Sequence, residues 1–188
     1  MRSKTFKQSF FKILLISLFF LFHNYTGLWA EHQFQKTLET RYSTIQYSKE
    51  AQILDFGKKI RRDQQAFYPT PEKDRAVVSL KDNVDDIVDR VKRLLDINPK
   101  DFRFTIYIFN SYAGLENAYL EHGMLGVAPI AFYSHNSRAI YLTIERLNPG
   151  VFAHEVAHAL INVYFAVPPP ADMQEVLAQY VDRNLWDE

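Results

Sequence analysis

The chain of 188 residues contains no cysteine and carries no net charge, since 22 lysines and arginines balance 22 aspartates and glutamates. Without cysteine it has no disulfide framework, no thiolate-ligated zinc or iron–sulfur site and no thiol nucleophile. The balanced charge gives no general basic field for nucleic acid or a membrane surface. With 47% hydrophobic residues, the chain also differs from a disordered polyelectrolyte. Any metal site must therefore use histidine and carboxylate ligands.

The first thirty residues contain no acidic residue and differ in kind from the rest. Four basic residues precede an apolar run at 13–22: Arg2, Lys4, Lys7 and Lys12. This run is well short of the roughly 20 residues that span a bilayer. A polar stretch that ends at Ala30 follows it, as in a secretory signal peptide. We expect cleavage after Ala30 and export of residues 31–188, to the periplasm or outside the cell, with an uncleaved membrane anchor as the less favoured alternative.

Residues 31–188 show no repeat, low-complexity tract or dividing linker, so we expect a single domain. Alternation and helical periodicity together predict an α+β fold. The predicted strands are 41–47, 102–108, 126–133 and 138–144. The predicted helices are 48–60, which Ser48 caps, 80–97 and 111–121, followed by one that begins at 148 and one that begins at about 172. A loop is predicted at 61–73. Pro129 cannot donate to a strand ladder, which places the strand 126–133 at a sheet edge or a bulge.

The predicted helix that Asn148 caps contains the motif HEVAH at 154–158. Residues four apart lie about 40° apart around a helix, so His154 and His158 leave the same face and can bind one metal ion. Glu155 projects beside them, where it can hydrogen-bond a metal-bound water. This is the HExxH arrangement of zinc metalloproteases. The apolar residues that flank the motif indicate a helix buried under a sheet.

A catalytic zinc site takes three protein ligands and keeps one position for water. Glu175 follows on the next predicted helix, which the triple proline at 168–170 turns back onto the first, and we predict it as the third ligand. Asp172 is its chief rival, because Asp172 and Glu175 also fit a capping box in which the glutamate only satisfies a backbone donor. Gln179, one turn beyond Glu175, is expected either to hydrogen-bond a ligand or to be a surface residue.

Other polar residues are expected to have ordinary structural roles. His122, near a helix end, and His135, in a turn, are expected to be solvated. Tyr133, Tyr141 and Tyr164 are expected to pack in the sheet or helices, although one of them can serve as a transition-state donor. The donor to an oxyanion is therefore left unassigned by the sequence.

The block 126–182, with GVAPIAFY, FAHEVAHALINVYF, PPP and QEVLAQYVD, resembles the catalytic core of gluzincin metallopeptidases, especially the small peptidase MA-like group. The resemblance covers about a third of the chain. It implies a zincin-like fold: a small mixed sheet with an edge strand above an HExxH active-site helix, and a C-terminal glutamate helix. It also implies zinc held by His154, His158 and Glu175, Glu155 as general base, and an edge strand near 126–133 on which an extended peptide pairs.

These features predict an exported zinc-dependent metallopeptidase that acts on a peptide or protein, with no nucleic-acid partner and no membrane attachment after signal cleavage. Zinc would activate water and Glu155 would move its proton to the leaving amine. Larger gluzincins follow their glutamate helix with a helical subdomain that donates to the oxyanion, whereas thirteen residues follow Glu175. The alternatives are a non-catalytic zinc-binding or partner-binding module on a zincin fold, and a structural protein with an accidental HExxH. The oligomeric state is not predicted.

Overall fold

The computed structural model describes residues 34–62 and 73–187. The chain separates into Met1–Gln35, of which only Phe34 and Gln35 are described, and a compact unit, Lys36–Glu188. The predicted signal peptide, residues 1–30, lies outside the described residues, as does most of the predicted loop at 61–73. No helix in the described part of the chain combines the length and the hydrophobicity needed to cross a membrane.

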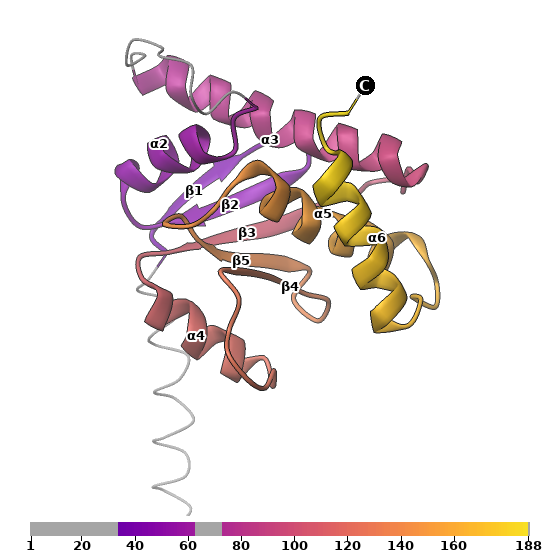
Figure 1. Ribbon diagram of the computed structural model, residues 1–188. Helices are drawn as coiled ribbons and strands as arrows, with labels where there is room; N and C mark the ends of the chain where they lie inside the picture. The colour runs from indigo at the N-terminus through magenta and orange to yellow at the C-terminus, as the bar shows by residue number, and fades with distance from the viewer. Residues whose placement is uncertain (1–33, 63–72, 188) are drawn as a thin grey trace, which may run out of the picture. The chain divides into compact units, whose positions relative to one another are not determined.

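The compact unit is built on one mixed β-sheet (Figure 1). The elements in chain order are β1 (Lys36–Glu39), β2 (Ser43–Tyr47), α2 (Glu50–Lys59), α3 (Lys73–Leu95), β3 (Phe104–Phe109), α4 (Tyr112–Glu121), β4 (Ala131–Ser134), β5 (Ala139–Thr143), α5 (Pro149–Tyr164) and α6 (Ala171–Asn184). The strand order is β1-β2-β3-β5-β4, with β2, β3 and β5 parallel and the two edge strands antiparallel to their neighbours. Within the described residues, these strands and helices confirm the predicted α+β class.

Periodicity located most of these elements, and the differences have local causes. The strand β1 was not predicted, because its sequence KTLE contains a single large apolar residue. The helix α3 begins at 73 rather than 80, since residues 74–79 are not buried and the buried stripe starts at Leu80. It ends at Leu95 rather than 97, and Asp96, in the left-handed region at φ 52°, reverses the chain there.

The predicted N-cap residue of α2 and the predicted start of the strand at 126–133 were also wrong. Lys49, not Ser48, holds the N-cap position of α2, because Oε1 of Gln52 accepts hydrogen bonds from the backbone N–H groups of Ser48 (2.9 Å) and Lys49 (2.8 Å). The predicted strand 126–133 is reduced to β4, which begins at Ala131 after Pro129 and lies at the sheet edge as expected.

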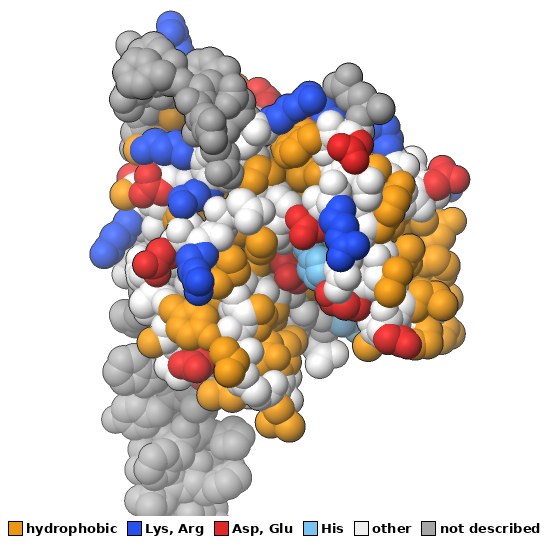
Figure 2. Space-filling model, viewed as in Figure 1, with side chains coloured by type: hydrophobic (Ala, Val, Ile, Leu, Met, Phe, Trp, Pro, Cys, Tyr) orange, Lys and Arg blue, Asp and Glu red, His pale blue; other side chains and the backbone are white. Residues whose placement is uncertain are grey.

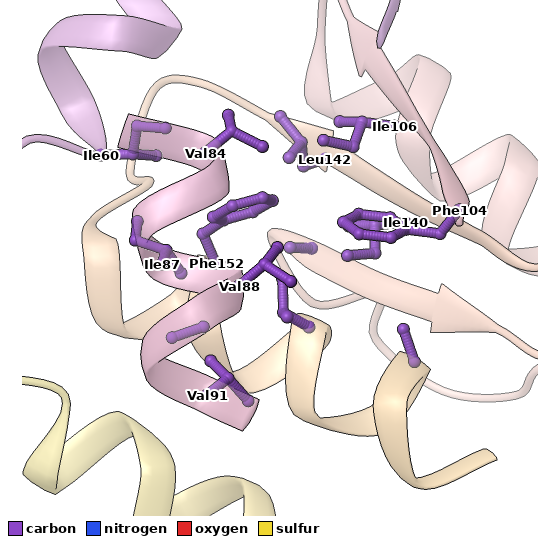
Figure 3. Close-up of a cluster of buried hydrophobic side chains, with 14 of the residues drawn as sticks. Ile60, Val84, Ile87, Val88, Val91, Phe104, Ile106, Ile140, Leu142 and Phe152 are labelled. Carbon is purple, nitrogen blue, oxygen red and sulfur yellow. The ribbon is translucent and has the colours of Figure 1, made fainter. Parts of the chain in front are cut away.

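One face of the sheet carries the apolar core (Figure 3). The strand residues Ile106, Ile140 and Leu142 meet the buried stripe of α3 and Phe152 from α5, and all of them are fully buried. The rings of Phe152 and Phe56 make an edge contact with centroids 5.5 Å apart. Each such side chain contributes about 1.5–3 kcal/mol through burial. This core fixes one side of α5 against the sheet and α3.

The opposite face of the sheet is covered in part by α4 (Figure 1). Tyr141 stacks on Phe132 with ring centroids 4.9 Å apart, so the prediction that Tyr141 packs is confirmed. The ring of His122 lies against Tyr141, and its Nδ1 is 3.2 Å from Oγ of Ser134. His122 is therefore half-buried among aromatic rings, contrary to the expectation that it is solvated, whereas His135 is exposed as expected.

The helices α5 and α6 form an antiparallel hairpin. Asn148 caps α5 by accepting a hydrogen bond from the backbone N–H of Val151 (3.0 Å), as predicted. A side chain at Gly150 would collide with Oδ1 of Asp182, so glycine allows α6 to approach the start of α5 closely. Beyond α6, Trp186 lies under Arg90 of α3, with the guanidinium carbon 4.8 Å from the ring centroid. These contacts set the position of α6 against α5.

Candidate metal centre

Three ligand atoms from α5 and α6 converge at one point. Nε2 of His154 and Nε2 of His158 are 3.2 Å apart, and Oε2 of Glu175 is 3.5 Å from the first and 3.6 Å from the second. The structure therefore brings together the three residues that the sequence predicted as ligands, and this group can hold a metal ion. The hairpin explains the convergence, because its second helix runs back along the face of α5 that carries both imidazoles.

The rival ligand and the capping box are not supported by the geometry. Oδ1 of Asp172 accepts a hydrogen bond from the backbone N–H of Met173 (2.9 Å) in the first turn of α6. Pro170 is the N-cap residue of α6 and makes no side-chain capping bond, so Glu175 belongs to no capping box. Its carboxylate is instead directed at the imidazoles.

The electrostatics favour the protonation states that bind metals. Burial, together with the neighbouring His154, lowers the pKa of His158, which favours neutral imidazole. Nε2 of Gln179 donates a hydrogen bond to Oε1 of Glu175 (3.0 Å), and this bond is the largest cause that lowers the pKa of Glu175. For Gln179 the sequence left open a contact with a ligand and a surface position, and the structure shows both, since the residue is exposed and hydrogen-bonds the predicted ligand. Neutral imidazole and ionised carboxylate are the forms that coordinate a cation.

The site is open to solvent on one side. The side chain of Glu175 is 47% exposed, and those of His154 and His158 are 19% and 18% exposed. In Figure 2, histidine and acidic side chains lie next to each other on the surface in the region of α5 and α6. A small ion and a water molecule can therefore reach the three ligand atoms.

Glu155 lies on α5 between the two histidines in sequence and faces the edge strand. It is buried, and its carboxylate accepts a hydrogen bond from the backbone N–H of Tyr133 in β4. Burial raises the pKa of Glu155 to about 8, and the nearby charge of Glu175 acts in the same direction, whereas the Tyr133 bond opposes it. The carboxyl therefore holds its proton at neutral pH in the metal-free protein.

The register of β4 explains why Tyr133 can make this bond. The backbone N–H of Thr143 in the β5 segment donates to the carbonyl of Ile130 (3.0 Å). Since hydrogen-bonded and outward-facing positions alternate along an antiparallel pair, the backbone groups of Ala131 and Tyr133 face away from β5. The edge of the sheet and the HExxH helix are thereby connected through Glu155.

The tyrosine hydroxyls do not supply an obvious donor to the site. The hydroxyl of Tyr133 is buried, it has no hydrogen-bond partner within the described residues, and burial raises its pKa to about 12. Tyr141 packs on the opposite face of the sheet, where its hydroxyl donates to Oγ of Ser137 (3.2 Å). Tyr164 is 48% exposed near the end of α5. The described contacts link none of these three hydroxyls to the ligand atoms.

Two amide side chains near His158 were not predicted from the sequence to belong to the site. Nδ2 of Asn162 donates to the backbone carbonyl of His158 and to Oε1 of Gln174, both at 2.8 Å. Nε2 of Gln174 donates to the carbonyl of Pro169 (2.8 Å), and the Gln174 side chain also hydrogen-bonds His158. Their positions in the sequence could have indicated them, since Asn162 is one helical turn after His158 and Gln174 directly precedes Glu175.

Comparison of the chain with protein-family models, with curated proteins and with solved structures found no match. The residues of the metal centre and their geometry therefore provide the basis for a functional proposal.

Proposed function

We propose that this chain is an exported metallopeptidase of the zincin type, in which His154, His158 and Glu175 hold a zinc ion. The convergence of these three ligand atoms is the observation that carries the proposal. Ligand atoms about 2.0–2.2 Å from a tetrahedral zinc ion lie roughly 3.3–3.6 Å from one another. The three measured separations of 3.2, 3.5 and 3.6 Å are close to this range without any rearrangement. Two histidines and a glutamate leave a fourth position for water.

Glu155 is the general base of the proposed reaction. A zinc ion held by these residues would lower the pKa of a water molecule and polarise a peptide carbonyl. The Glu155 carboxylate takes the proton from water as the new C–O bond forms, and it returns the proton to the amine nitrogen as the C–N bond breaks. The base must be ionised for this role. The Tyr133 N–H stabilises its carboxylate form, and a cation among the neighbouring ligands favours that form further.

An extended peptide is the proposed substrate, and the edge strand supports this choice. The outward-facing N–H and carbonyl of Ala131 and the outward-facing carbonyl of Tyr133 provide a donor and acceptors on which a further strand can pair, while the Tyr133 N–H is engaged by Glu155. Tyr133 also touches Glu155 through its N–H, so a peptide paired on β4 would lie beside the general base. This arrangement agrees with the edge strand implied by the resemblance to gluzincins.

The test compares Glu155→Gln with the wild-type chain in two assays. We expect the variant to retain one zinc per chain by metal analysis, because Glu155 is not a ligand. We expect cleavage of a peptide library to fall by about 10²–10⁴-fold, the usual contribution of a general base. Glu121→Gln, an exposed carboxylate at the end of α4, is the matched control and should change neither quantity. Cleavage by Glu155→Gln at the wild-type rate would contradict the proposal.

A zinc-binding or partner-binding module that hydrolyses nothing is the second candidate. The burial of Glu155, which is 8% exposed, favours it, because a buried carboxyl that holds its proton is a poor base. Wild-type protein with one zinc per chain and no cleavage of any peptide or folded protein would support this candidate over the first.

A further inference from the structure

The outer side of the α5–α6 hairpin exposes a group of large apolar side chains. Six of the eleven large apolar side chains that are exposed within the described residues lie between 164 and 180: Tyr164, Phe165, Val167, Met173, Val176 and Tyr180. Figure 2 shows hydrophobic side chains gathered along the right-hand edge of the molecule, where α6 and the turn before it lie in Figure 1. A contiguous apolar patch of this kind marks an interaction surface on a globular protein.

Three of these side chains form one stripe along α6. The α6 stripe consists of Met173, Val176 and Tyr180, which are 54%, 66% and 48% exposed. Spacings of three and four residues place them within about 60° of one another around the helix. The buried residues of α6, Ala178 and Val181, belong to the core instead. The helix is therefore apolar on two sides, and in the described part of the chain only the core side is covered.

The charges beside the α6 stripe are complementary to each other. Asp172 lies in the first turn of α6 and Arg183 in the last turn, and both are exposed. Residues eleven apart lie about 20° from each other around a helix and roughly 17 Å apart along it. Both charges therefore lie on the same side of the stripe, next to Val176, with the acid at one end and the base at the other.

A second copy of the chain matches this pattern. When two helices pack antiparallel about a two-fold axis, the same side of each helix meets and the start of one lies beside the end of the other. Asp172 of each copy then lies opposite Arg183 of the second copy. In the same arrangement Met173 packs beside Tyr180 of the second copy, and Val176 lies near the axis. The apolar and charged contacts are thus satisfied together.

The charge of this surface disfavours a phosphate-bearing partner. Arg183 is the only lysine or arginine that follows Arg146 in the sequence. The helix α6 carries three acidic residues against this one base: Asp172, Glu175 and Asp182. Nucleic acid and anionic lipid headgroups would be repelled by this excess of negative charge. The second copy supplies its own base at the required position.

We infer that the chain forms a two-fold dimer through the α6 stripe, with Asp172 of each copy paired with Arg183 of the other. An interface built on one helix from each copy is at the small end of specific interfaces, so we expect dissociation in the micromolar range. Such dimers dissociate on dilution, and folding can then be measured on single copies. The inference is independent of the proposed function, because the stripe contains no proposed metal ligand.

Sedimentation velocity over a range of micromolar concentrations tests the dimer, on protein purified after expression of the full chain. Val176→Glu places a charge near the axis and should weaken dimerisation by at least about 10-fold. Val127→Glu is the matched control, because this valine is 88% exposed in the loop before β4, away from the stripe. A wild-type chain that stays monomeric throughout, or a dimer that Val176→Glu leaves intact, would overturn the inference.

Charge reversal tests the antiparallel arrangement. Asp172→Arg and Arg183→Asp each place like charges opposite one another, and each should weaken dimerisation several-fold. The variant with both changes restores opposite charges and should dimerise within a few-fold of wild type. The unfolding free energy of each single copy shows that the variants fold. Losses that simply add in the double variant would overturn the pairing of Asp172 with Arg183.

The absence of cysteine allows a further test that leaves these charges unchanged. Val176→Cys places one thiol near the axis in each copy and should oxidise readily to a disulfide-linked dimer, since a disulfide needs the two Cβ atoms about 4 Å apart. Val127→Cys should remain mostly reduced at the same concentration. Equal cross-linking of the two variants would overturn the inference. A monomeric wild type that binds neutral phosphatidylcholine vesicles through Val176 would also overturn it and assign the stripe to a membrane surface.

Discussion

The two sides of α5 have opposite kinds of surroundings. One side, with Phe152, enters the apolar core between the sheet and α3, where buried apolar side chains pack against one another. The other side carries polar residues that meet polar residues of α6 and β4. We call this group the polar seam and define it as Tyr133, His154, Glu155, His158, Asn162, Gln174, Glu175 and Gln179. In the core, stability follows from buried area, and similar residues can replace one another. In the seam, each polar group depends on a particular partner. A substitution there should change chemistry more than folding.

The largest expected effect is in the core. Phe152→Ala removes a fully buried ring that packs on Phe56, and we expect a loss of about 3–5 kcal/mol in the unfolding free energy. Chemical denaturation of the metal-free protein measures it. Val176→Ala, at a site that is 66% exposed, is the control and should change stability by less than about 0.5 kcal/mol. A loss below about 1 kcal/mol for Phe152→Ala would show that burial of this ring contributes little to the unfolding free energy.

The second effect separates binding from folding within the seam. Glu175→Ala should weaken zinc binding by at least about 100-fold, because loss of a ligand costs more affinity than loss of a residue that only hydrogen-bonds a ligand. The unfolding free energy of the metal-free variant should stay close to that of the wild type. Asp172→Ala, three residues earlier on α6, should bind zinc normally, because its carboxylate contacts only the backbone N–H of Met173 among the described hydrogen bonds. Metal analysis and chelator competition compare the two. Zinc loss in the Asp172 variant alone would overturn the assigned ligand set.

The third effect concerns the pH dependence of the seam. The folded-state pKa of Glu155, about 8, lies above its ordinary value of 4.5, so the folded metal-free protein binds this proton more tightly than the unfolded chain. Its contribution to stability is fully present below about pH 4.5 and is lost as the pH rises to about 8. Glu155→Gln keeps an acceptor for Tyr133 and should remove this decline, with a gain on the order of 2 kcal/mol or more at pH 8.

Denaturation of both proteins in the presence of a chelator, from pH 5 to pH 9, tests this expectation. Parallel stability curves for wild type and Glu155→Gln would show that Glu155 is ionised in the folded protein without metal. The proposed contrast between the seam and the core would then be weaker than we infer.

The smallest effect concerns the packing of α6 on α5. Gly150→Ala places a methyl group against the Asp182 carboxylate, which must rotate away, and we expect a loss of about 1 kcal/mol. Asp182→Ala should relieve this loss, so a double-mutant cycle of unfolding free energies should give a clear interaction between the two sites. Additive effects would mean that the two residues do not meet in solution. Zinc affinity should change little in either variant.

Much of this site was predictable from spacing within a single helix. Residues four apart in HEVAH share a face whatever surrounds the helix, so the pairing of His154 with His158 followed from helical geometry. Glu175 needed one further assumption, that the triple proline reverses the chain. Gln174 and Asn162 were not found, because a glutamine or asparagine at helical spacing is common on exposed surfaces and nothing local separates the two cases. Similarly, β1 has almost no apolar signal, since an edge strand of four residues contributes little to the core.

By itself, the sequence determined the α+β class, the helix that carries HEVAH and the exclusion of cysteine ligands, since each depends on composition or on local periodicity. Only the tertiary structure placed Glu175, and not Asp172, beside the two imidazoles, buried Glu155 against the edge strand and joined Gln174 to Asn162 across the hairpin. The physical reason is that these relations depend on how α6 and β4 pack against α5. Hydrogen bonds and desolvation between elements distant in the sequence are set by that packing, and no local pattern encodes them.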